Sequence, residues 1–178
     1  MITMMKRGLI ALGALLLFGG VNYSIWHKEN IKRNGEVMYM DLAPVDPRSL
    51  MQGDYMTLNF RLARDIETGI NLPLQRAWSQ NAEPSKPADA PREGEIRFAN
   101  IALDEKHIAS YRPAAEAKSI KLRYRIRQGR VWLGTNGFFF EEGKAALYNK
   151  ARYGEFRLDR DSGEAVLVGL RNDKLESL

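Results

Sequence analysis

Few residues of this 178-residue chain are of the types that usually perform chemistry. The chain has no cysteine, which excludes disulfides and thiolate metal ligands. Its two histidines, His27 and His107, are far apart in the sequence and are weak evidence for a metal site. No glycine-rich phosphate loop and no Gly-x-Ser-x-Gly nucleophile motif occurs. The residue types therefore predict no cofactor, no metal site and no catalytic residue.

One segment, residues 46–60, combines turn-forming residues with an alternating pattern. Asp46, Pro47 and Ser49 favour a turn, through side-chain bonds to the backbone and a fixed φ. After Gly53 and Asp54 the residues alternate between apolar and polar, which predicts a half-buried strand over 55–62. The inward face would carry Met56, Leu58, Phe60 and Leu62, and the outward face Tyr55, Thr57, Asn59 and Arg61.

Two interpretations of this segment are open. In the structural one, Gly53 takes a φ that other residues avoid and Asp54 bonds neighbouring backbone N–H groups, which together shape a corner. In the other, Asp46, Arg48, Asp54 and Tyr55 form a recognition surface. We favour the structural role. The candidate residues, whether structural or partner-binding, are Asp46, Pro47, Arg48, Gly53, Asp54, Tyr55, Leu58 and Phe60.

The N-terminal part predicts a membrane anchor. Residues 8–26 carry no charge, and a helix of that length spans roughly 28 Å, close to the bilayer's hydrocarbon thickness of about 30 Å. Tyr23 and Trp26 fall where aromatic rings prefer the membrane interface. A cleaved signal peptide is the alternative, but no Ala-x-Ala-like site follows. We expect a cytoplasmic tail over 1–7, a transmembrane helix over 8–26, a stem over 27–34 and a domain over 35–178.

The charge pattern bears on partners and orientation. A net charge of +5 suits an anionic membrane surface or a polar partner, and no aromatic-basic motif or recognition helix indicates nucleic acid. Lys and Arg flank the apolar run on both sides, so the positive-inside rule barely discriminates. A short N-terminal tail usually stays inside. We therefore expect a single-pass protein of the cytoplasmic (inner) membrane with its C-terminal domain outside the cytoplasm.

Beyond the stem the pattern predicts a mainly β domain, an antiparallel sheet or partly open barrel with one short helix. Prolines between 64 and 92 forbid a long helix there, so we expect a surface excursion. The short helix would lie within 141–153. Strands are expected at 37–42, 55–62, 95–103, 108–111, 120–127, 131–133, 155–159 and 165–170, with a strand-like aromatic run at 138–140.

Residues 120–127 give the clearest pattern, because apolar and cationic residues alternate strictly. Only a strand sorts such residues onto two faces. The outward stripe would consist of Lys121, Arg123, Arg125 and Arg127. It could bind lipid headgroups or an acidic partner. We favour an ordinary solvated face whose charges also discourage edge pairing.

The stretch Leu50-x-x-Gly53-Asp54-Tyr55 resembles the corner after the nucleophile in membrane-anchored signal peptidases. Counting back from Gly53 places Val45 at the nucleophile position, and valine cannot attack a peptide. That resemblance therefore implies a shared scaffold without the catalytic group. The enzymatic alternative is a membrane-tethered serine hydrolase or protease that uses Ser49 with a distant lysine such as Lys121.

A closer resemblance is to the family named for a GDYXXLXY motif. Residues 53–60 fit that motif at every specified position except the last, where Phe60 replaces tyrosine and loses its hydroxyl. The resemblance continues through 42–50, 138–143 and 151–156. The family is described as bacterial membrane-anchored proteins without an assigned activity, which implies export of the β domain and no catalytic residues. We expect a non-catalytic accessory or partner-binding protein that contacts the lipid bilayer through residues 8–26 and another membrane or envelope protein.

Overall fold

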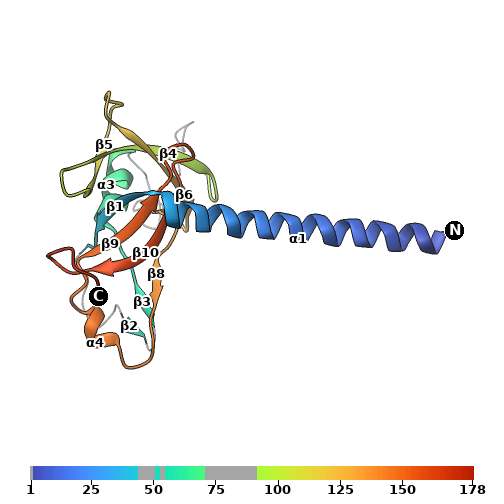
Figure 1. Ribbon diagram of the computed structural model, residues 1–178. Helices are drawn as coiled ribbons and strands as arrows, with labels where there is room; N and C mark the ends of the chain where they lie inside the picture. The colour runs from blue at the N-terminus through green and yellow to red at the C-terminus, as the bar shows by residue number, and fades with distance from the viewer. Residues whose placement is uncertain (1, 44–50, 53–54, 71–91) are drawn as a thin grey trace, which may run out of the picture.

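A computed structural model describes residues 2–43, 51–52, 55–70 and 92–178 (Figure 1). Helix α1 (Ile2–Asn34) is continuous and projects from the β domain. The predicted stem over 27–34 is therefore the last part of the same helix. Gly35 follows the last residue of α1, and its backbone N–H donates to the Ile31 carbonyl at 2.8 Å. A Cβ at Gly35 would lie 2.5 Å from that carbonyl oxygen, so a side chain does not fit this exit.

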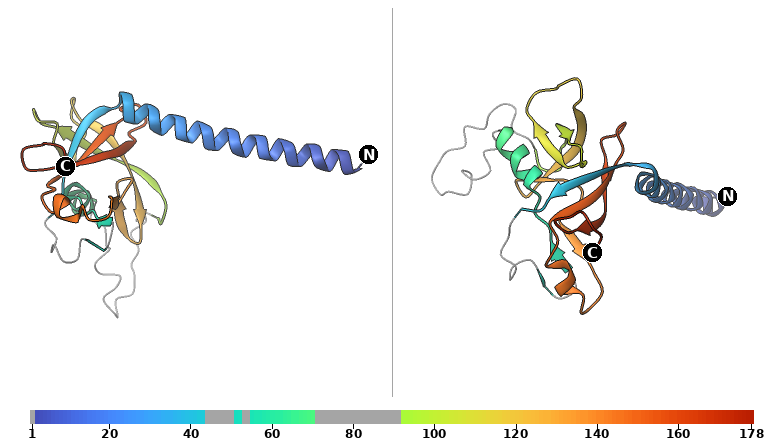
Figure 2. Two further views of the ribbon diagram at one scale, coloured as in Figure 1. Left: turned by 60° about the horizontal axis from the view of Figure 1, so that its bottom comes forward. Right: turned by 60° about the vertical axis from the view of Figure 1, so that its left-hand side comes forward.

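The β domain consists of antiparallel sheets, which confirms the predicted fold class (Figures 1 and 2). One sheet has the order β1-β9-β10, with β1 at Glu36–Asp41, β9 at Tyr153–Leu158 and β10 at Ala165–Arg171. A second has the order β2-β3-β8, with β2 at Met51–Gln52, β3 at Tyr55–Thr57 and β8 at Gly137–Phe139. The third has the order β5-β4-β6-β7, with β4 at Ile96–Leu103, β5 at Ala109–Arg112, β6 at Ile120–Arg127 and β7 at Arg130–Trp132.

The strand predicted over 55–62 is wrong in its second half. β3 ends at Thr57, and helix α3 (Arg61–Gly69) begins four residues later. The alternation misled because Leu62 and Ile66, four residues apart, are the buried side chains of one helix face. With α4 (Ala145–Tyr148) as the expected short helix, the prediction of a single short helix in the domain is also wrong. The excursion predicted from residue 64 begins within α3, and residues 71–91 lie outside the described part.

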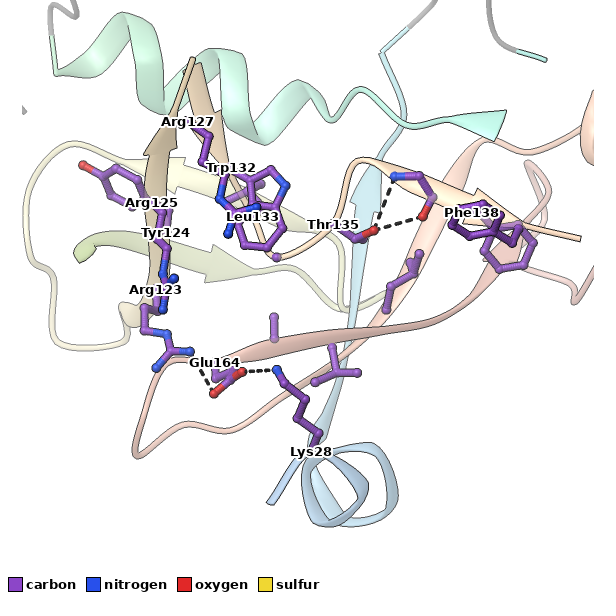
Figure 3. A pocket seen from close by; sticks show the side chains of 16 residues that line it. Lys28, Arg123, Tyr124, Arg125, Arg127, Trp132, Leu133, Thr135, Phe138 and Glu164 are labelled. Carbon is purple, nitrogen blue, oxygen red and sulfur yellow. Dashed lines mark hydrogen bonds and ion pairs between the residues drawn. The ribbon is translucent and has the colours of Figure 1, made fainter. Parts of the chain in front are cut away.

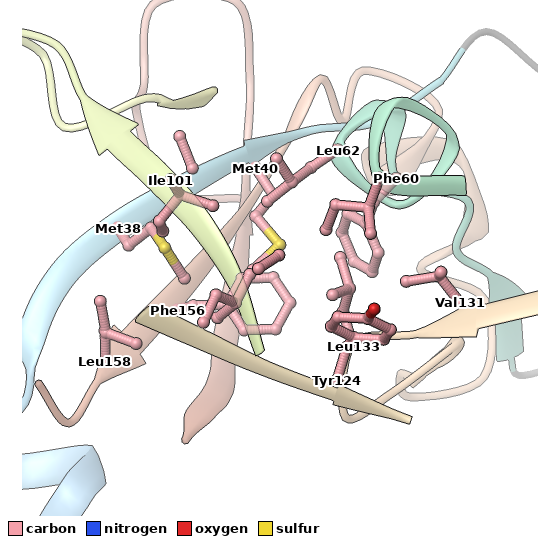
Figure 4. Close-up of a cluster of buried hydrophobic side chains, with 14 of the residues drawn as sticks. Met38, Met40, Phe60, Leu62, Ile101, Tyr124, Val131, Leu133, Phe156 and Leu158 are labelled. Atoms are coloured by element: carbon pink, nitrogen blue, oxygen red, sulfur yellow. The ribbon is translucent and has the colours of Figure 1, made fainter. Parts of the chain in front are cut away.

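The core lies between the sheets and under α3 (Figure 4). The inward faces predicted for two segments are confirmed, because Met56, Leu58, Phe60 and Leu62 are buried, as are the apolar residues of β6. Bridges at Tyr39–Ile108 and Leu42–Phe60 connect β1 to β5 and to the end of the motif segment. The largest fully buried side chains are Phe156, Met38, Met40, Ile66, Ile101, Leu122, Leu158 and Leu170.

Candidate binding groove

The structure describes only part of the candidate motif. Tyr55, Leu58 and Phe60 are described, whereas Asp46, Pro47, Arg48, Gly53 and Asp54 lie outside the described residues. The recognition surface proposed for the polar members is therefore still a prediction. The same holds for the hydrolase alternative, because Ser49 and Val45 are outside the described part and Lys121 is an exposed residue of β6.

Leu58 and Phe60 have structural roles. The Leu58 N–H donates to the Asn136 carbonyl at 2.8 Å, which fixes the end of β3 to the segment before β8. The Phe60 side chain is 4% exposed, and its ring meets Phe156 edge-on with centroids 5.3 Å apart. Gly154 leaves room for this contact, since a Cβ there would lie 2.9 Å from the Phe60 ring. Both residues therefore contribute to the core or to the backbone pairing of the β domain.

Tyr55 lies on the other face, as predicted, and is half-buried. Its ring pairs with Phe139 across the β3–β8 ladder, with centroids 5.7 Å apart. The Phe139 side chain is 80% exposed, which is unusual for a phenylalanine. Phe139 also lines a groove at the side of the domain, so the motif reaches that groove through Tyr55.

The groove has a volume of about 550 Å³ (Figure 3). One wall is formed by β6 and β7, and the other by β8 and the start of β10. Lys28 reaches the groove from α1, which Figure 3 shows nearly end-on beneath it. The alternation of β6 explains the basic wall, because the apolar side chains that enter the core leave Arg123, Arg125 and Arg127 on the opposite face.

The groove is strongly cationic. Among its described lining residues, Glu164 is the single carboxylate, against Lys28 and the arginines of β6. The Arg127 guanidinium lies over the Trp132 ring, 3.9 Å from the centroid. A concave surface with one sign of charge concentrates the opposite charge, and aromatic faces add apolar contact area. The groove therefore suits an acidic ligand with apolar groups.

Glu164 joins the N-terminal helix to the β domain. Its carboxylate lies 2.7 Å from Lys28 Nζ, 2.9 Å from a guanidinium nitrogen of Arg123 and 3.6 Å from His27 Nε2. Burial alone would raise the pKa of the Glu164 carboxyl, but the hydrogen bond from Lys28 and the charges of Lys28 and Arg123 hold it below its usual value. No sequence pattern indicated this residue, because Glu164 and Lys28 are 136 positions apart and no local pattern links them.

Replacing Glu164 by glutamine tests this joint through its pH dependence. A carboxyl whose folded-state pKa is lowered stabilises the fold above its unfolded pKa, near 4.5, and that contribution is lost as pH falls through the folded-state value. We therefore expect Glu164→Gln to lower the free energy of unfolding of the full-length chain in micelles by about 1 kcal/mol at neutral pH. The difference in the free energy of unfolding between the wild type and Glu164→Gln should vanish in acid, where the Glu164 carboxyl is protonated in both the folded and the unfolded state. Glu142→Gln, at an exposed position, is the control, and an equal loss in both variants would contradict the prediction.

Two strand edges beside the groove lack a partner strand among the described elements. β8 pairs with β3 alone, and β10 pairs with β9 alone, with a single bridge to Ser177 at its far end. β7 is also terminal in its sheet, but its Val131 N–H donates to Glu67 Oε1 at 2.8 Å. An open edge presents backbone donors and acceptors that an extended segment can pair with.

The described residues around the groove do not form a metal site or present a free nucleophilic hydroxyl at Thr135. No group of three His, Cys, Asp or Glu residues that could hold a metal occurs in the described ranges. The Thr135 hydroxyl is engaged with the backbone of Gly137, to whose carbonyl it donates at 2.9 Å.

Fold and groove together define the class of protein: a mainly β domain with a cationic, aromatic groove, carried on one long apolar N-terminal helix. Comparison with known families then identifies it further. The chain belongs to the GDYXXLXY protein family, whose model matches residues 17–170. No curated protein and no solved structure matches the chain. None of these comparisons supports the resemblance to signal peptidases.

Proposed function

We propose that this protein is a single-pass accessory protein of a bacterial inner membrane, whose β domain outside the cytoplasm binds an acidic segment of another envelope protein. The observation that carries the proposal is the cationic groove with its open strand edges, located beside α1. The segment would lie close to the membrane, because Lys28 at the groove follows the apolar part of the helix by only a few residues.

The anchor rests on the length and exposure of α1. Residues Ile10–Asn34 are long and apolar enough to cross a bilayer. Large apolar side chains along this part, including Leu15, Phe18 and Trp26, are exposed. A projecting helix with such a surface is poorly suited to water, whereas a bilayer would cover it. Tyr23 and Trp26 pack on each other with centroids 6.1 Å apart, where the span would meet the interface.

An extended acidic segment matches each part of the groove. Its backbone would pair with the open edge of β8 or β10, its carboxylates would meet Arg125 and Arg127, and its apolar side chains would contact Trp132 and Phe139. Backbone pairing gives affinity that tolerates sequence change, and the charges select the partner. Such a site binds without needing a nucleophile.

Charge reversal in the groove tests the proposal. We expect Arg125→Glu with Arg127→Glu to reduce partner capture by at least about tenfold, because the acidic segment would meet like charges. The full-length protein, affinity-tagged at its C-terminus, is crosslinked in spheroplasts with a membrane-impermeant reagent, and captured proteins are identified by mass spectrometry. Lys150→Glu with Lys174→Glu is the control of equal charge at exposed positions away from the groove.

Two outcomes count against the proposal. Equal capture by groove and control variants, both with the wild-type unfolding midpoint, would exclude the groove as the binding site. Capture with a membrane-permeant reagent but none with the impermeant one would place the β domain on the cytoplasmic side.

A further inference from the structure

A second surface adjoins the groove on the outer face of the β5-β4-β6-β7 sheet. It lies on β4, β5 and the first half of β6, whereas the groove wall continues on the same face through Arg125, Arg127 and Trp132. The register places Phe98 opposite Arg123 and Ile96 opposite Arg125. Further along β4, Asn100 is opposite Lys121 on one side and Arg112 on the other. All these residues point away from the core, because the alternate positions of β6 are buried. We call Ile96, Phe98, Arg112, Lys121 and Arg123 the lipid face.

The composition of this face is amphipathic. Phe98 is 54% exposed and Ile96 is 46% exposed, and cationic residues flank both across the strands. Within the described part of the chain, neither Lys121 nor Arg112 forms an ion pair. Apolar side chains between long cationic ones are typical of surfaces that enter the headgroup layer, because the apolar groups insert while the charges stay among the phosphates.

The position of the face relative to α1 favours the same partner. The Arg123 N–H donates to the Gly163 carbonyl at 2.8 Å, and a Cβ on Gly163 would lie 3.3 Å from the Phe98 ring. The next residue, Glu164, binds both Arg123 and Lys28. Lys28 is two residues beyond Trp26, a rise of about 3 Å. Phe98 is therefore connected by direct contacts to the part of α1 where the bilayer would end.

We propose that the lipid face of the sheet binds the headgroup region of an anionic bilayer beside the anchor. The proposal rests on the membrane anchoring of α1 but does not require the protein partner. The positive charge of the lipid face is complementary to anionic lipid headgroups. Phe98 and Ile96 would contact the apolar part of the bilayer, which a soluble anion lacks. Docking of this face would hold the β domain against the membrane at one orientation, which also fixes the direction in which the groove opens.

A site-specific probe measures this contact in the full-length protein. The chain has no cysteine, so Ile96→Cys provides a single attachment point for a nitroxide and leaves Phe98 in place. Lys174→Cys, an exposed position after β10 near the C-terminus, is the matched control. Both are reconstituted in vesicles of phosphatidylcholine with or without phosphatidylglycerol, and collisions with a nickel-chelating lipid are measured. We expect several-fold more frequent collisions at position 96, increasing with phosphatidylglycerol.

Charge removal then tests the mechanism. Each cation near an anionic surface changes the docking equilibrium by about fivefold. Arg112→Gln with Lys121→Gln should therefore reduce the ratio of docked to undocked domain by about 25-fold, whereas Lys150→Gln with Lys174→Gln should leave it unchanged. Circular dichroism checks that each variant is folded.

Three results overturn the proposal. Equal collision frequencies at positions 96 and 174 would show that the face does not touch the bilayer, and insensitivity to phosphatidylglycerol or to the Arg112 and Lys121 changes would exclude charge recognition. Release of the chain from vesicles by alkaline washing would remove the anchor, and with it both the lipid face and the proposed function. A retained chain with equal collisions would remove the lipid face alone.

Discussion

Phe60→Ala should lower the free energy of unfolding of the β domain by about 3–5 kcal/mol. The Phe60 ring is buried at the point where the motif segment bridges to Leu42 and packs edge-on against Phe156 of the central strand β9. Truncation to alanine removes the buried apolar surface of the ring and leaves a cavity in its place. The neighbouring Gly154 cannot fill this cavity, because glycine has no side chain. Chemical unfolding of the full-length chain in micelles, followed by far-ultraviolet circular dichroism, measures the effect.

The matched control is Phe139→Ala. Both residues are phenylalanines near the same motif segment, but Phe139 is 80% exposed, so its truncation should change the free energy of unfolding by no more than about 0.5 kcal/mol. For capture of the partner protein we expect the reverse, with Phe139→Ala causing the larger loss, because Phe139 lines the groove. Similar destabilisation in both variants would contradict the structural role of Phe60. The pair thus separates the effect of Phe60 on folding from the binding role that we propose for Phe139.

Glu155→Ala should destabilise the domain by a comparable amount, about 3–5 kcal/mol. Glu155 is 5% exposed on β9, between β1 and β10, and is the buried charged residue of the described core. Its carboxylate accepts a hydrogen bond from Arg171 Nε at 2.6 Å and lies 3.5 Å from a guanidinium nitrogen of Arg157. Removing the carboxylate leaves the partly buried Arg171 without its counter-charge, which costs more than the ion pair itself contributes.

Unfolding titrations of two further variants check this explanation. Glu155→Gln keeps an acceptor for Arg171 and should lose less stability than Glu155→Ala. Glu141→Ala removes an exposed carboxylate paired with Lys144 within one turn of chain, and should leave the unfolding midpoint unchanged. If Glu155→Ala behaved like Glu141→Ala, the buried ion pair would not stabilise the central strand.

These expectations separate three parts of the molecule that serve different ends. Phe60 and Glu155 are buried in the domain, Glu164 attaches α1 to it, and the groove and the lipid face carry cations for which we propose binding roles. Arg123 belongs to the joint and to both surfaces, because its guanidinium binds Glu164 while its strand carries Lys121 and Arg125. Variants of Arg123 would therefore mix several effects, whereas variants of its neighbours Lys121 and Arg125 separate them.

Local pattern was sufficient where one element buries one face. The alternation of residues 120–127 predicted β6 and its inward side, and the uncharged run within α1 predicted a helix long enough to cross a membrane. Local pattern was not sufficient at residues 58–66. Leu58, Phe60 and Leu62 are spaced two apart, as in a strand, whereas Leu62 and Ile66 are spaced four apart, as on one face of a helix. Both periods therefore fit the sequence around Leu62, and only the packing of the folded domain selects the helix.

The motif shows the same division. Its sequence alone determined membership of the GDYXXLXY family and the inward positions of Leu58 and Phe60. Only the tertiary structure decided that Tyr55 leads to an exposed phenylalanine, that Glu164 joins Lys28 to Arg123, and that β8 and the start of β10 leave their edges without a partner strand beside one groove. The physical reason is that period and propensity act over a few residues, whereas a groove is made by side chains and strand edges that only the packing of distant segments brings together.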